Sequence, residues 1–300
     1  MQTKRKIAIA ICYYLQAEKY INNDECFPLQ LGYDETGLDL GIQKDNEGEQ
    51  RSDKHFLYSE YSGIYWLWKN VNAEYKGMLH HRRFLTKENH GIYFKIKKTV
   101  WHIIYRIKSI VTPHAYTYRS IIECGSSLQY YKLANSFSSQ IESIFNDGFD
   151  MIVPKPVFYY PHSIKNRFDE VIHRSFLISV KKTIQKKHPE YISSFNETLN
   201  GNILYYANLE IMRNELFEEY CDFIFTIFDG VEKDLVESKA FLNLSKELSF
   251  YRSFGYLGEI LTSTFITKKK KENKKIKECT VLFNKDCKGN ENTNYSIMNL

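Results

Sequence analysis

The chain has 300 residues, of which 43% are hydrophobic and 15% aromatic, with only 14 Gly and 6 Pro. This composition excludes collagen-like, linker-rich and disordered proteins, and it supplies enough apolar side chains for one large α/β domain or two small ones. The net charge of +5 lies entirely in residues 268–300, which carry nine lysines and four acidic residues. Because the rest of the chain is neutral, it lacks the basic surface that binding of RNA or DNA requires.

Membrane-spanning and secretory signals are absent from the sequence. No stretch approaches the ~20 apolar residues that cross a bilayer, and the first apolar run, residues 7–14, is too short for a signal peptide. We therefore expect a cytoplasmic protein. The six cysteines are scattered and include no C-x-x-C pair, so we expect them to stay reduced, several as small core residues rather than as zinc ligands.

The order of the predicted elements indicates an α/β fold. Residues 7–12 (IAIAIC) are apolar on both faces, which is typical of a strand in a parallel sheet covered by helices. The pattern then predicts an extended segment over 27–32, a polar loop over 34–54, a helix over 56–70, and strands over 75–79 and 149–153. It further predicts helices over 168–186, 188–199 and 213–228, with a strand over 203–211 between the last two. This alternation favours a mixed sheet.

Residues 92–111 place apolar side chains at three- and four-residue spacing among Lys and Arg, with Trp101 near the middle. A basic amphipathic helix of this kind suits a membrane interface. It is equally compatible with an ordinary helix that faces the core and keeps a solvated basic side. The composition leaves both interpretations open.

Residues 268–277 contain seven lysines. Such a run is usually solvated and disordered, and anionic lipid attracts it by roughly 1 kcal/mol per residue close to the surface. We expect a flexible tail over 268–300 that acts together with the 92–111 segment to hold the protein on the inner face of the cell membrane. An anionic membrane surface, and not nucleic acid, is therefore the expected polyanionic partner.

Two histidines and two arginines, His80, His81, Arg82 and Arg83, directly follow the predicted strand over 75–79. Open α/β sheets bind ligands at the carboxyl ends of their strands. Two guanidinium groups there would clamp a diphosphate through bidentate hydrogen bonds. The alternative is a surface loop whose arginines form ion pairs.

Two glutamates are candidates for contact with a ligand. Glu60 lies on the predicted helix over 56–70, whose aromatic face is otherwise core. Gly63 in the same helix costs about 1 kcal/mol relative to Ala, which indicates close approach of another backbone or of a ligand. Glu259 ends the glycine-containing stretch that leads into a final helix; it is a candidate general base, or it only favours the helix dipole.

Common signatures of other nucleotide-binding and hydrolytic sites are absent. The metal-binding D-x-D of many nucleotide-sugar transferases does not occur. Neither does a glycine-rich phosphate loop, a G-x-S-x-G or an H-E-x-x-H motif.

Several segments taken in order resemble the bacterial capsular and exopolysaccharide glycosyltransferase family, long catalogued only as a domain of unknown function. The segments are 28–32 (PLQLG), 45–52 (DNEGEQRS), 58–70 (YSEYSGIYWLWKN), 75–83 (YKGMLHHRR), 150–155 (DMIVPK), Asn208 in ANL, and 252–259 (RSFGYLGE). The helix end YWLWKN, followed so closely by HHRR, is the specific part. The chain departs from the family at two places. The first strand ends in Cys12-Tyr13-Tyr14, where the family usually has a Thr-His-Lys-like sequence, and this change bears on the contact with the nucleotide base. His81 stands where the family has Tyr.

The resemblance, which covers residues 5–265, implies a GT-A-like fold with a mixed, mostly parallel sheet flanked by helices. The expected domain spans residues 1–267, with a basic amphipathic insertion at 92–124 and the tail at 268–300. The resemblance also implies a nucleotide-diphosphate sugar donor, with UDP-sugars of the galactose type expected. The implied acceptor is a glycan or a polyprenyl-linked glycan in capsule, exopolysaccharide or O-antigen assembly.

The hypothesis for the site combines the resemblance with the residues. Catalytic candidates are Glu259, as the base that deprotonates the acceptor hydroxyl in an inverting displacement, and His80. Donor-side candidates are Asp45, Asn46, Ser52, Glu60, Tyr65, His81, Arg82 and Arg83, and acceptor-side candidates are Asn208 and Arg252. The arginine pair would neutralise the leaving diphosphate in place of a metal, so we expect no required cofactor, with Mn²⁺ or Mg²⁺ as the alternative.

Two other classes of function compete with this hypothesis. The first is a non-catalytic scaffold at the membrane surface that recruits polysaccharide enzymes through its basic segments. The second is an RNA-binding module, which the neutral body of the chain disfavours.

Overall fold

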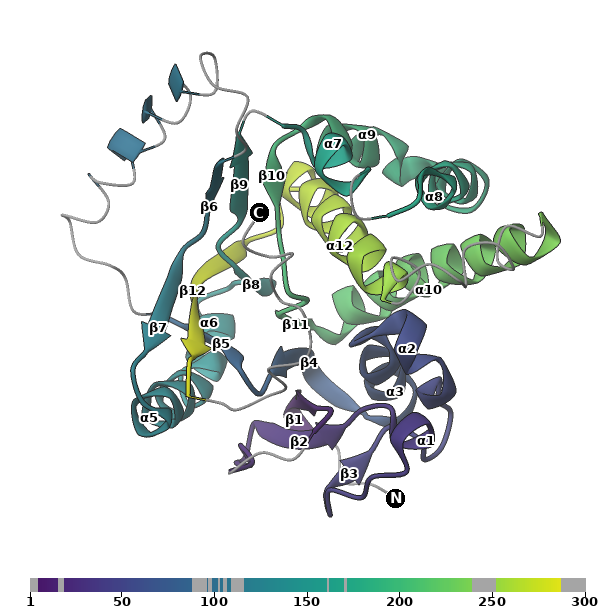
Figure 1. The fold of residues 1–300 in the computed structure, drawn as a ribbon. Helices are drawn as coiled ribbons and strands as arrows, with labels where there is room; N and C mark the ends of the chain where they lie inside the picture. The colour runs from purple at the N-terminus through teal and green to yellow at the C-terminus, as the bar shows by residue number, and fades with distance from the viewer. Residues whose placement is uncertain are drawn as a thin grey trace.

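The computed structural model describes residues 5–15, 19–87, 96, 99–101, 103–104, 107–108, 116–160, 162–169, 172–238 and 252–286. They form a large mixed sheet with helices on both faces and a smaller sheet beside it (Figure 1). The strands of the large sheet are β1 (Arg5–Tyr13), β2 (Cys26–Gln30), β3 (Gln43–Lys44), β4 (Ala73–His80), β5 (Arg83–Thr86), β7 (Ile121–Cys124), β8 (Met151–Pro154), β11 (Glu210–Arg213) and β12 (Ile276–Asn284). The small sheet consists of β6 (Tyr116–Tyr118), β9 (Val157–Tyr160) and β10 (Ile203–Leu204).

Strand β1 lies between β2 and β4 and runs parallel to both. Residues 8–11 of β1 have no exposed surface, because helices cover both faces of the sheet at this point. The prediction of a doubly covered first strand in a mixed α/β sheet is confirmed. Parallel pairing holds from β3 to β4, whereas β5 and β11 run antiparallel to β4.

Strand β4 changes its neighbour along the edge that faces away from β1. Residues 75–78 pair with β11, but His80 pairs with Arg83 of β5. The pairings of β4, β11, β8, β12 and β5 close into a ring. The carboxyl end of β4 is therefore a point where the sheet topology switches, and α/β sheets bind ligands at such points.

The helices are α1 (Tyr33–Thr36), η1 (Ser52–Lys54), α2 (His55–Tyr58), α3 (Tyr61–Asn70), α5 (Ser127–Ser138), α6 (Ile141–Asn146), α7 (Ile164–Phe168), α8 (Arg174–Lys187), η2 (Pro189–Tyr191), α9 (Ile192–Asn200), α10 (Asn214–Glu237) and α12 (Ser253–Lys271). Two neighbouring residues of β4 show how they divide between the faces. Tyr75 stacks on Phe145 of α6 with ring centroids 4.1 Å apart, while the ammonium of Lys76 lies 5.5 Å from the ring of Phe217 in α10. Because successive strand residues point to opposite faces, α6 and α10 cover opposite faces of the sheet.

Helix α3 packs against the sheet at Gly63. A Cβ atom at this position would lie 2.5 Å from Cδ2 of Leu31 and 2.9 Å from Cε of Met78. The close approach that the sequence indicated is therefore an approach of the protein's own core.

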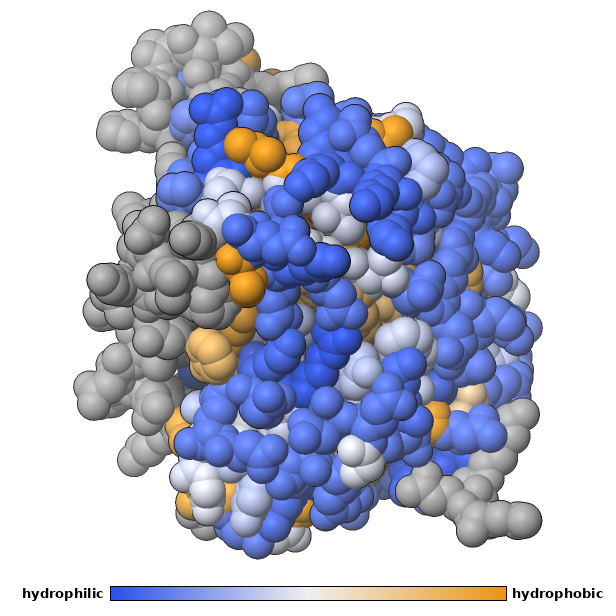
Figure 2. Space-filling model, turned by 90° about the vertical axis from the view of Figure 1, so that its right-hand side faces the viewer, coloured by the Kyte–Doolittle hydropathy of each residue, from blue (hydrophilic) through white to orange (hydrophobic). Residues whose placement is uncertain are grey.

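The face that carries α8 and the far end of α10 is mainly hydrophilic, with hydrophobic residues in small separate groups (Figure 2).

Two predicted elements are interrupted by residues in the left-handed region. The helix expected over 56–70 is divided into α2 and α3, because Ser59 adopts a φ of 51°. The strand expected over 203–211 is divided into β10 and β11, because Ala207 and Asn208 adopt φ values of 68° and 49°. Non-glycine residues in this region cost about 1–3 kcal/mol each and occur mostly at functional sites.

The structure differs from the predicted flexible tail. Helix α12 continues to Lys271, and β12 is inserted into the large sheet between β5 and β8 (yellow in Figure 1). Three lysines of the run meet acidic partners from other elements. Lys269 is only 3% exposed, and its ammonium lies 2.6 Å from Glu219 of α10. Lys270 and Lys271 pair with Glu278 and Glu197, each at 2.7 Å. The paired lysines are thus part of the folded domain and not of a flexible tail. Only residues 287–300 of the predicted tail lie outside the described residues.

The predicted insertion over 92–124 is partly built into the sheets. Strand β7 pairs with β12 and β6 pairs with β9, while most of residues 88–115 lie outside the described residues. Five cysteines (Cys12, Cys26, Cys124, Cys221 and Cys279) are buried and free, as expected, and Cys287 lies outside the described residues. In the described part of the chain, no helix combines the length and the apolar character needed to cross a membrane.

Candidate active site

The four residues after β4 lie at the topological switch. His80 is the last residue of β4, and Arg83 begins β5 across a tight turn. His81 stacks on Tyr13 at the end of β1, with ring centroids 5.3 Å apart, and its Nδ1 lies 3.0 Å from the carbonyl oxygen of Cys12. The predicted location at the carboxyl end of a buried strand is confirmed.

A carboxylate and two basic side chains meet beside this turn. Glu60, at the N-terminal end of α3, lies 3.7 Å from Nδ1 of His80 and 3.6 Å from Nη2 of Arg252. Arg252 precedes α12 with a φ of 67°, and its Nε donates a hydrogen bond to Oγ of Ser59 at 3.2 Å. The two strained residues, Ser59 and Arg252, therefore support one another and hold the charged groups together.

The charges of this group follow from burial and proximity. Burial lowers the pKa of His80, and with Arg83 and Arg252 acting in the same direction and Glu60 against it the pKa is about 4, so the imidazole is neutral at pH 7. Burial alone would raise the pKa of Glu60, but Arg252 and, at acid pH, the protonated form of His80 outweigh it and lower the pKa to about 2, so the carboxylate is ionised at pH 7. Among the described residues, the Nε2 atom of His80 is buried and makes no hydrogen bond of ordinary geometry, although the backbone of Ala207 lies close enough to act on the pKa of the ring.

Glu259 completes what we call the central cluster, namely Glu60, His80, Arg83, Arg252 and Glu259. It extends from α12, and its Oε1 accepts a hydrogen bond from the backbone N–H of Ala207 at 2.8 Å. Burial and the nearby Glu60 raise its pKa to about 7, against the effects of this hydrogen bond and of Arg83. A carboxyl group with a pKa near the working pH is suited to act as a general base.

A buried network holds the strained turn at Ala207 and Asn208. The hydroxyl of Tyr61 donates to Oδ1 of Asn208 at 2.8 Å and lies 2.9 Å from Oγ1 of Thr262. The hydroxyl of Tyr220 lies 2.8 Å from Oγ1 of Thr262 and 3.0 Å from Oε1 of Glu210, so it links these two residues. Asn208 thus positions the turn beside Glu259; its predicted contact with an acceptor stays a prediction.

Glu210 gives a stability prediction, because burial together with Glu60 and Glu259 raises its pKa to about 8 from an ordinary 4.5. The folded state therefore binds one more proton than the unfolded state between these values, and stability falls as pH rises through that window. Glu210→Gln keeps an oxygen that accepts from Tyr220 but cannot ionise. We expect the unfolding free energy of the variant minus that of the wild type, measured by denaturant titration, to increase by up to about 1.4 kcal/mol per pH unit from pH 5 to 8.

The control for this experiment is Glu237→Gln, which makes the same change at an exposed residue that pairs with Lys233. Its stability difference from the wild type should not depend on pH in this range. Parallel curves for Glu210→Gln and the wild type would show that Glu210 ionises normally.

Three donor-side candidates, Asp45, Asn46 and Ser52, form a supporting loop beside the cluster. Asp45 is fully buried; its carboxylate accepts from Oγ of Ser52 at 2.6 Å, from Oγ of Ser62 at 2.9 Å and from the backbone N–H of Gly32 at 3.2 Å. A carboxylate with three internal donors has little capacity left for a ligand. We therefore reassign Asp45 and Ser52 to a positioning role, whereas Asn46 keeps a buried oxygen without a hydrogen-bond partner among the described residues.

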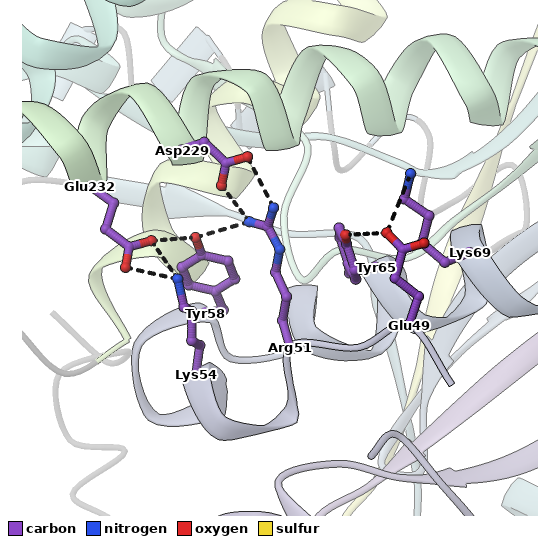
Figure 3. Close-up of polar contacts among 8 residues, drawn as sticks. All are labelled: Glu49, Arg51, Lys54, Tyr58, Tyr65, Lys69, Asp229 and Glu232. Carbon is purple, nitrogen blue, oxygen red and sulfur yellow. Dashed lines mark hydrogen bonds and ion pairs between the residues drawn. The ribbon is translucent and has the colours of Figure 1, made fainter. Parts of the chain in front are cut away.

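Tyr65 lies away from the central cluster, so the structure does not join it to the other candidates. Its hydroxyl donates to Glu49 at 2.7 Å, and the guanidinium of Arg51 lies 4.3 Å from its ring centroid. Arg51 in turn makes a bidentate pair with Asp229 of α10, at 2.6 and 3.0 Å (Figure 3). Beside it, Lys54 lies 2.8 Å from Glu232 of the same helix. These contacts clasp the 45–54 loop to α10.

Loss of this clasp should destabilise the fold. Arg51→Met keeps the apolar stem but removes the bidentate pair and the cation–π contacts, and we expect a loss of about 1–3 kcal/mol in unfolding free energy. Lys233→Met, which breaks an exposed pair between neighbouring turns of α10, should change it by less than about 0.5 kcal/mol. Denaturant titration of both variants checks the difference; equal effects would mean that Arg51 acts only as a surface charge.

Further site residues could not be identified from sequence spacing. Arg119, between β6 and β7, acts electrostatically on Glu259 and on Tyr206. Arg167 of α7 and Arg119 both act on Tyr159 of β9. The only hint was composition, because YTYRS at 116–120 is rich in aromatic and basic residues. Arg119, Tyr159 and Tyr206 come within electrostatic reach of Glu259 because the small sheet packs beside the large one.

Arg82 and Arg83 differ in their surroundings. The guanidinium of each lies over the ring of Phe283 in β12, at 5.4 and 5.9 Å. Both act on His81, and Arg83 also acts on His80, Glu259 and Tyr206. Arg83 is therefore the member of the pair that belongs to the central cluster. Within the described ranges, no group of three or more His, Cys, Asp and Glu side chains is placed to hold a metal ion.

Comparison with known proteins supports the fold assignment. A solved structure titled "WbbM bifunctional glycosyltransferase apo structure" superposes with a TM-score of 0.69 at 20% identity, over 94% of this chain and 46% of the other. The chain thus spans about half the length of that protein. No curated protein matches the sequence. Residues 8–271 match the family described as "Domain of unknown function (DUF4422)", and since this match covers most of the chain, the protein belongs to that family.

Proposed function

We propose that the protein is a GT-A-like glycosyltransferase that moves a sugar from a nucleotide-diphosphate donor to a glycan or polyprenyl-linked glycan. One observation carries the proposal: Glu259, whose pKa is raised to about 7, accepts a hydrogen bond from the backbone of Ala207 and lies within electrostatic reach of Arg83, the first residue of β5 at the switch. A base of this kind next to fixed cations is what displacement of a diphosphate by a hydroxyl requires. The fold shared with a glycosyltransferase structure supports this assignment.

In the proposed reaction, Glu259 takes the proton of the acceptor hydroxyl while the acceptor oxygen bonds to the anomeric carbon of the sugar. The bond from that carbon to the diphosphate oxygen breaks on the opposite side, so the configuration inverts. Arg83, helped by Arg82, stabilises the negative charge that builds up on the leaving diphosphate. His80 donates or accepts a hydrogen bond without carrying charge, and Arg252 keeps Glu60 ionised and in place.

The finer assignments remain parts of the proposal. A UDP-sugar of the galactose type is the favoured donor, and capsule, exopolysaccharide or O-antigen assembly is the favoured pathway. The guanidinium groups take the role that a metal has elsewhere, so we propose metal-independent transfer. Activity that requires Mn²⁺ or Mg²⁺ and is abolished by a chelator would contradict this point.

A donor-hydrolysis screen tests the function directly. Purified protein is incubated with UDP-, GDP- and TDP-sugars, with and without divalent metal, and the released nucleotide is measured. We expect slow hydrolysis of one donor class because water replaces the missing acceptor. If no sugar nucleotide binds or reacts while anionic vesicles still bind, the non-catalytic scaffold is the better description.

We also propose that the protein associates with the inner face of the cell membrane. Support comes from Ile96, Val100, Ile103 and Ile107, which are helical, spaced three or four residues apart, and between 47% and 60% exposed. Apolar side chains at this spacing form one stripe. Ile103→Glu should weaken sedimentation with phosphatidylglycerol vesicles about tenfold or more, because it puts a charge into that stripe. Ile178→Glu, at an exposed apolar residue of α8, is the matched control; equal losses would contradict the proposal.

A further inference from the structure

The turn at Ala207 and Asn208 binds the proposed base through its backbone. The N–H of Ala207 donates to Oε1 of Glu259 at 2.8 Å, and the backbone of the same residue acts on the pKa of the His80 ring. One peptide segment therefore reaches both catalytic candidates. This placement depends on the left-handed conformation of the turn, with φ values of 68° and 49°, which non-glycine residues keep only where their surroundings enforce it.

Two side chains outside the turn enforce this conformation. The hydroxyl of Tyr61 in α3 donates to Oδ1 of Asn208 at 2.8 Å, and both residues are almost fully buried. On the other side of Ala207, Oγ of Ser263 in α12 accepts from the backbone N–H of Tyr205 at 2.8 Å. The turn is thus tied to α3 through its own side chain and to α12 through the chain that leads into it.

The bond from Tyr61 has a fixed direction and a fixed place. An amide oxygen can only accept, so the single proton of the phenol is committed to Asn208. The ring cannot move toward α12, because a Cβ atom on Gly258 would overlap it. Since Gly258 directly precedes Glu259, the residue that holds the turn packs on the same stretch of helix that carries the base.

The N–H of Ala207 favours the ionised form of Glu259. Burial raises the pKa of this carboxyl to about 7, and the hydrogen bond from Ala207 opposes the increase. Without that bond Glu259 would keep its proton to higher pH and would be a less available base at pH 7. The titratable groups that interact electrostatically with Glu259 in the described structure include Glu60, Arg83, Arg119, Glu210, Tyr61, Tyr159, Tyr206 and Tyr256.

We propose that Tyr61 is a positioning residue for the base: its bond to Asn208 fixes the turn, and the turn aims the backbone N–H of Ala207 at Glu259. This inference rests on the proposed function, since it gives Tyr61 a part in the proton transfer of that reaction. Tyr61 acts through the turn and does not touch the substrate.

A direct titration of Glu259 tests the proposal without relying on activity. The full chain is labelled with carbon-13 in the side-chain carboxyl groups of glutamate, and Glu259→Gln identifies the signal that belongs to Glu259. We expect a midpoint near pH 7 in the wild type. In Tyr61→Phe it should lie about one pH unit higher, because the ionised carboxylate loses a positioned donor.

The pH profile of transfer should change in the same direction. In Tyr61→Phe, kcat/KM at pH 6 should fall about tenfold, because a base with a pKa one unit higher is ionised about ten times less often at this pH. At pH 9, where the base is ionised in both proteins, it should change by less than about threefold.

Two further variants serve as controls. Asn208→Gly removes the same bond from its other side and guards against a Tyr61→Phe variant that fails to fold, since glycine adopts the left-handed conformation without strain. It should give the same shift, and the double variant should give no larger one, because both changes remove a single interaction. Tyr191→Phe makes the same change at a buried tyrosine whose hydroxyl donates to Glu219 at 2.7 Å, and it should leave the midpoint unchanged.

The outcomes separate this proposal from the proposed function. An unchanged midpoint in both Tyr61→Phe and Asn208→Gly, or an equal shift in Tyr191→Phe, would overturn the positioning role and leave the proposed function intact. A shifted midpoint in a protein that neither binds nor hydrolyses any sugar nucleotide would overturn the proposed function and leave the effect of Tyr61 on Glu259 standing.

Discussion

Replacing Arg83 with Met is expected to lower kcat/KM for sugar transfer by about 100- to 1,000-fold, which is the usual effect of removing one preorganised group that stabilises charge in a transition state. Arg83 lies where the proposed leaving diphosphate would gain charge, and it acts on both His80 and Glu259. Met preserves the stem over the ring of Phe283, so the folded structure should persist. Steady-state kinetics with the donor identified by the screen measure the effect.

Two comparisons sharpen this experiment. Arg82→Met should reduce transfer less than Arg83→Met, because Arg83 is the member of the pair whose charge acts on Glu259 and on His80. Arg5→Met removes the same charge at the far end of β1 and should retain full activity. Near-normal turnover of Arg83→Met, with an unchanged melting temperature, would remove the phosphate clamp from the mechanism.

Replacing Glu259 with Gln is expected to lower kcat by about 100-fold or more, since general bases contribute roughly that factor. Gln keeps an oxygen that accepts from the backbone N–H of Ala207, so the turn stays in place. In the wild type, kcat/KM should fall as pH drops below about 7, because a base must be deprotonated and the pKa of Glu259 is about 7. The variant should lack this acid limb.

Glu259→Gln should also make the protein more stable than the wild type at high pH. The pKa of Glu259 is raised in the folded state from an ordinary 4.5, so stability falls as pH rises from 4.5 to 7, and the full cost is present above pH 7. Glu259→Gln avoids that cost and should melt at a higher temperature than the wild type at pH 8. A variant that is less stable than the wild type at pH 8 and whose residual activity keeps the acid limb would show a structural rather than catalytic role.

Local patterns in the sequence were sufficient for the elements that surround the site. The doubly apolar run at 7–12 determined a buried parallel strand, and the order of elements determined a mixed α/β sheet, because both depend on periodicity within short windows. The position of His80 to Arg83 at a strand end follows from the same reasoning. The family resemblance had the same basis, since its specific part lies within residues 58–83.

The run of lysines shows where local reasoning fails. Composition at 268–277 is that of a solvated tail, yet Lys269 is buried against Glu219, which lies fifty residues away in the chain. Whether a lysine stays in water or is buried depends on whether an acidic side chain lies next to it, and only the packing of distant segments brings that side chain there.

What the sequence by itself determined is therefore the class of fold and the cationic end of β4. What only the tertiary structure decided is which charges meet: Glu60 with Arg252, Glu259 with Arg83 and Arg119, and Asp45 with its own loop rather than a ligand. The physical reason is that secondary structure follows from neighbours along the chain, whereas pKa values and binding sites depend on burial and on distances between residues far apart in the chain.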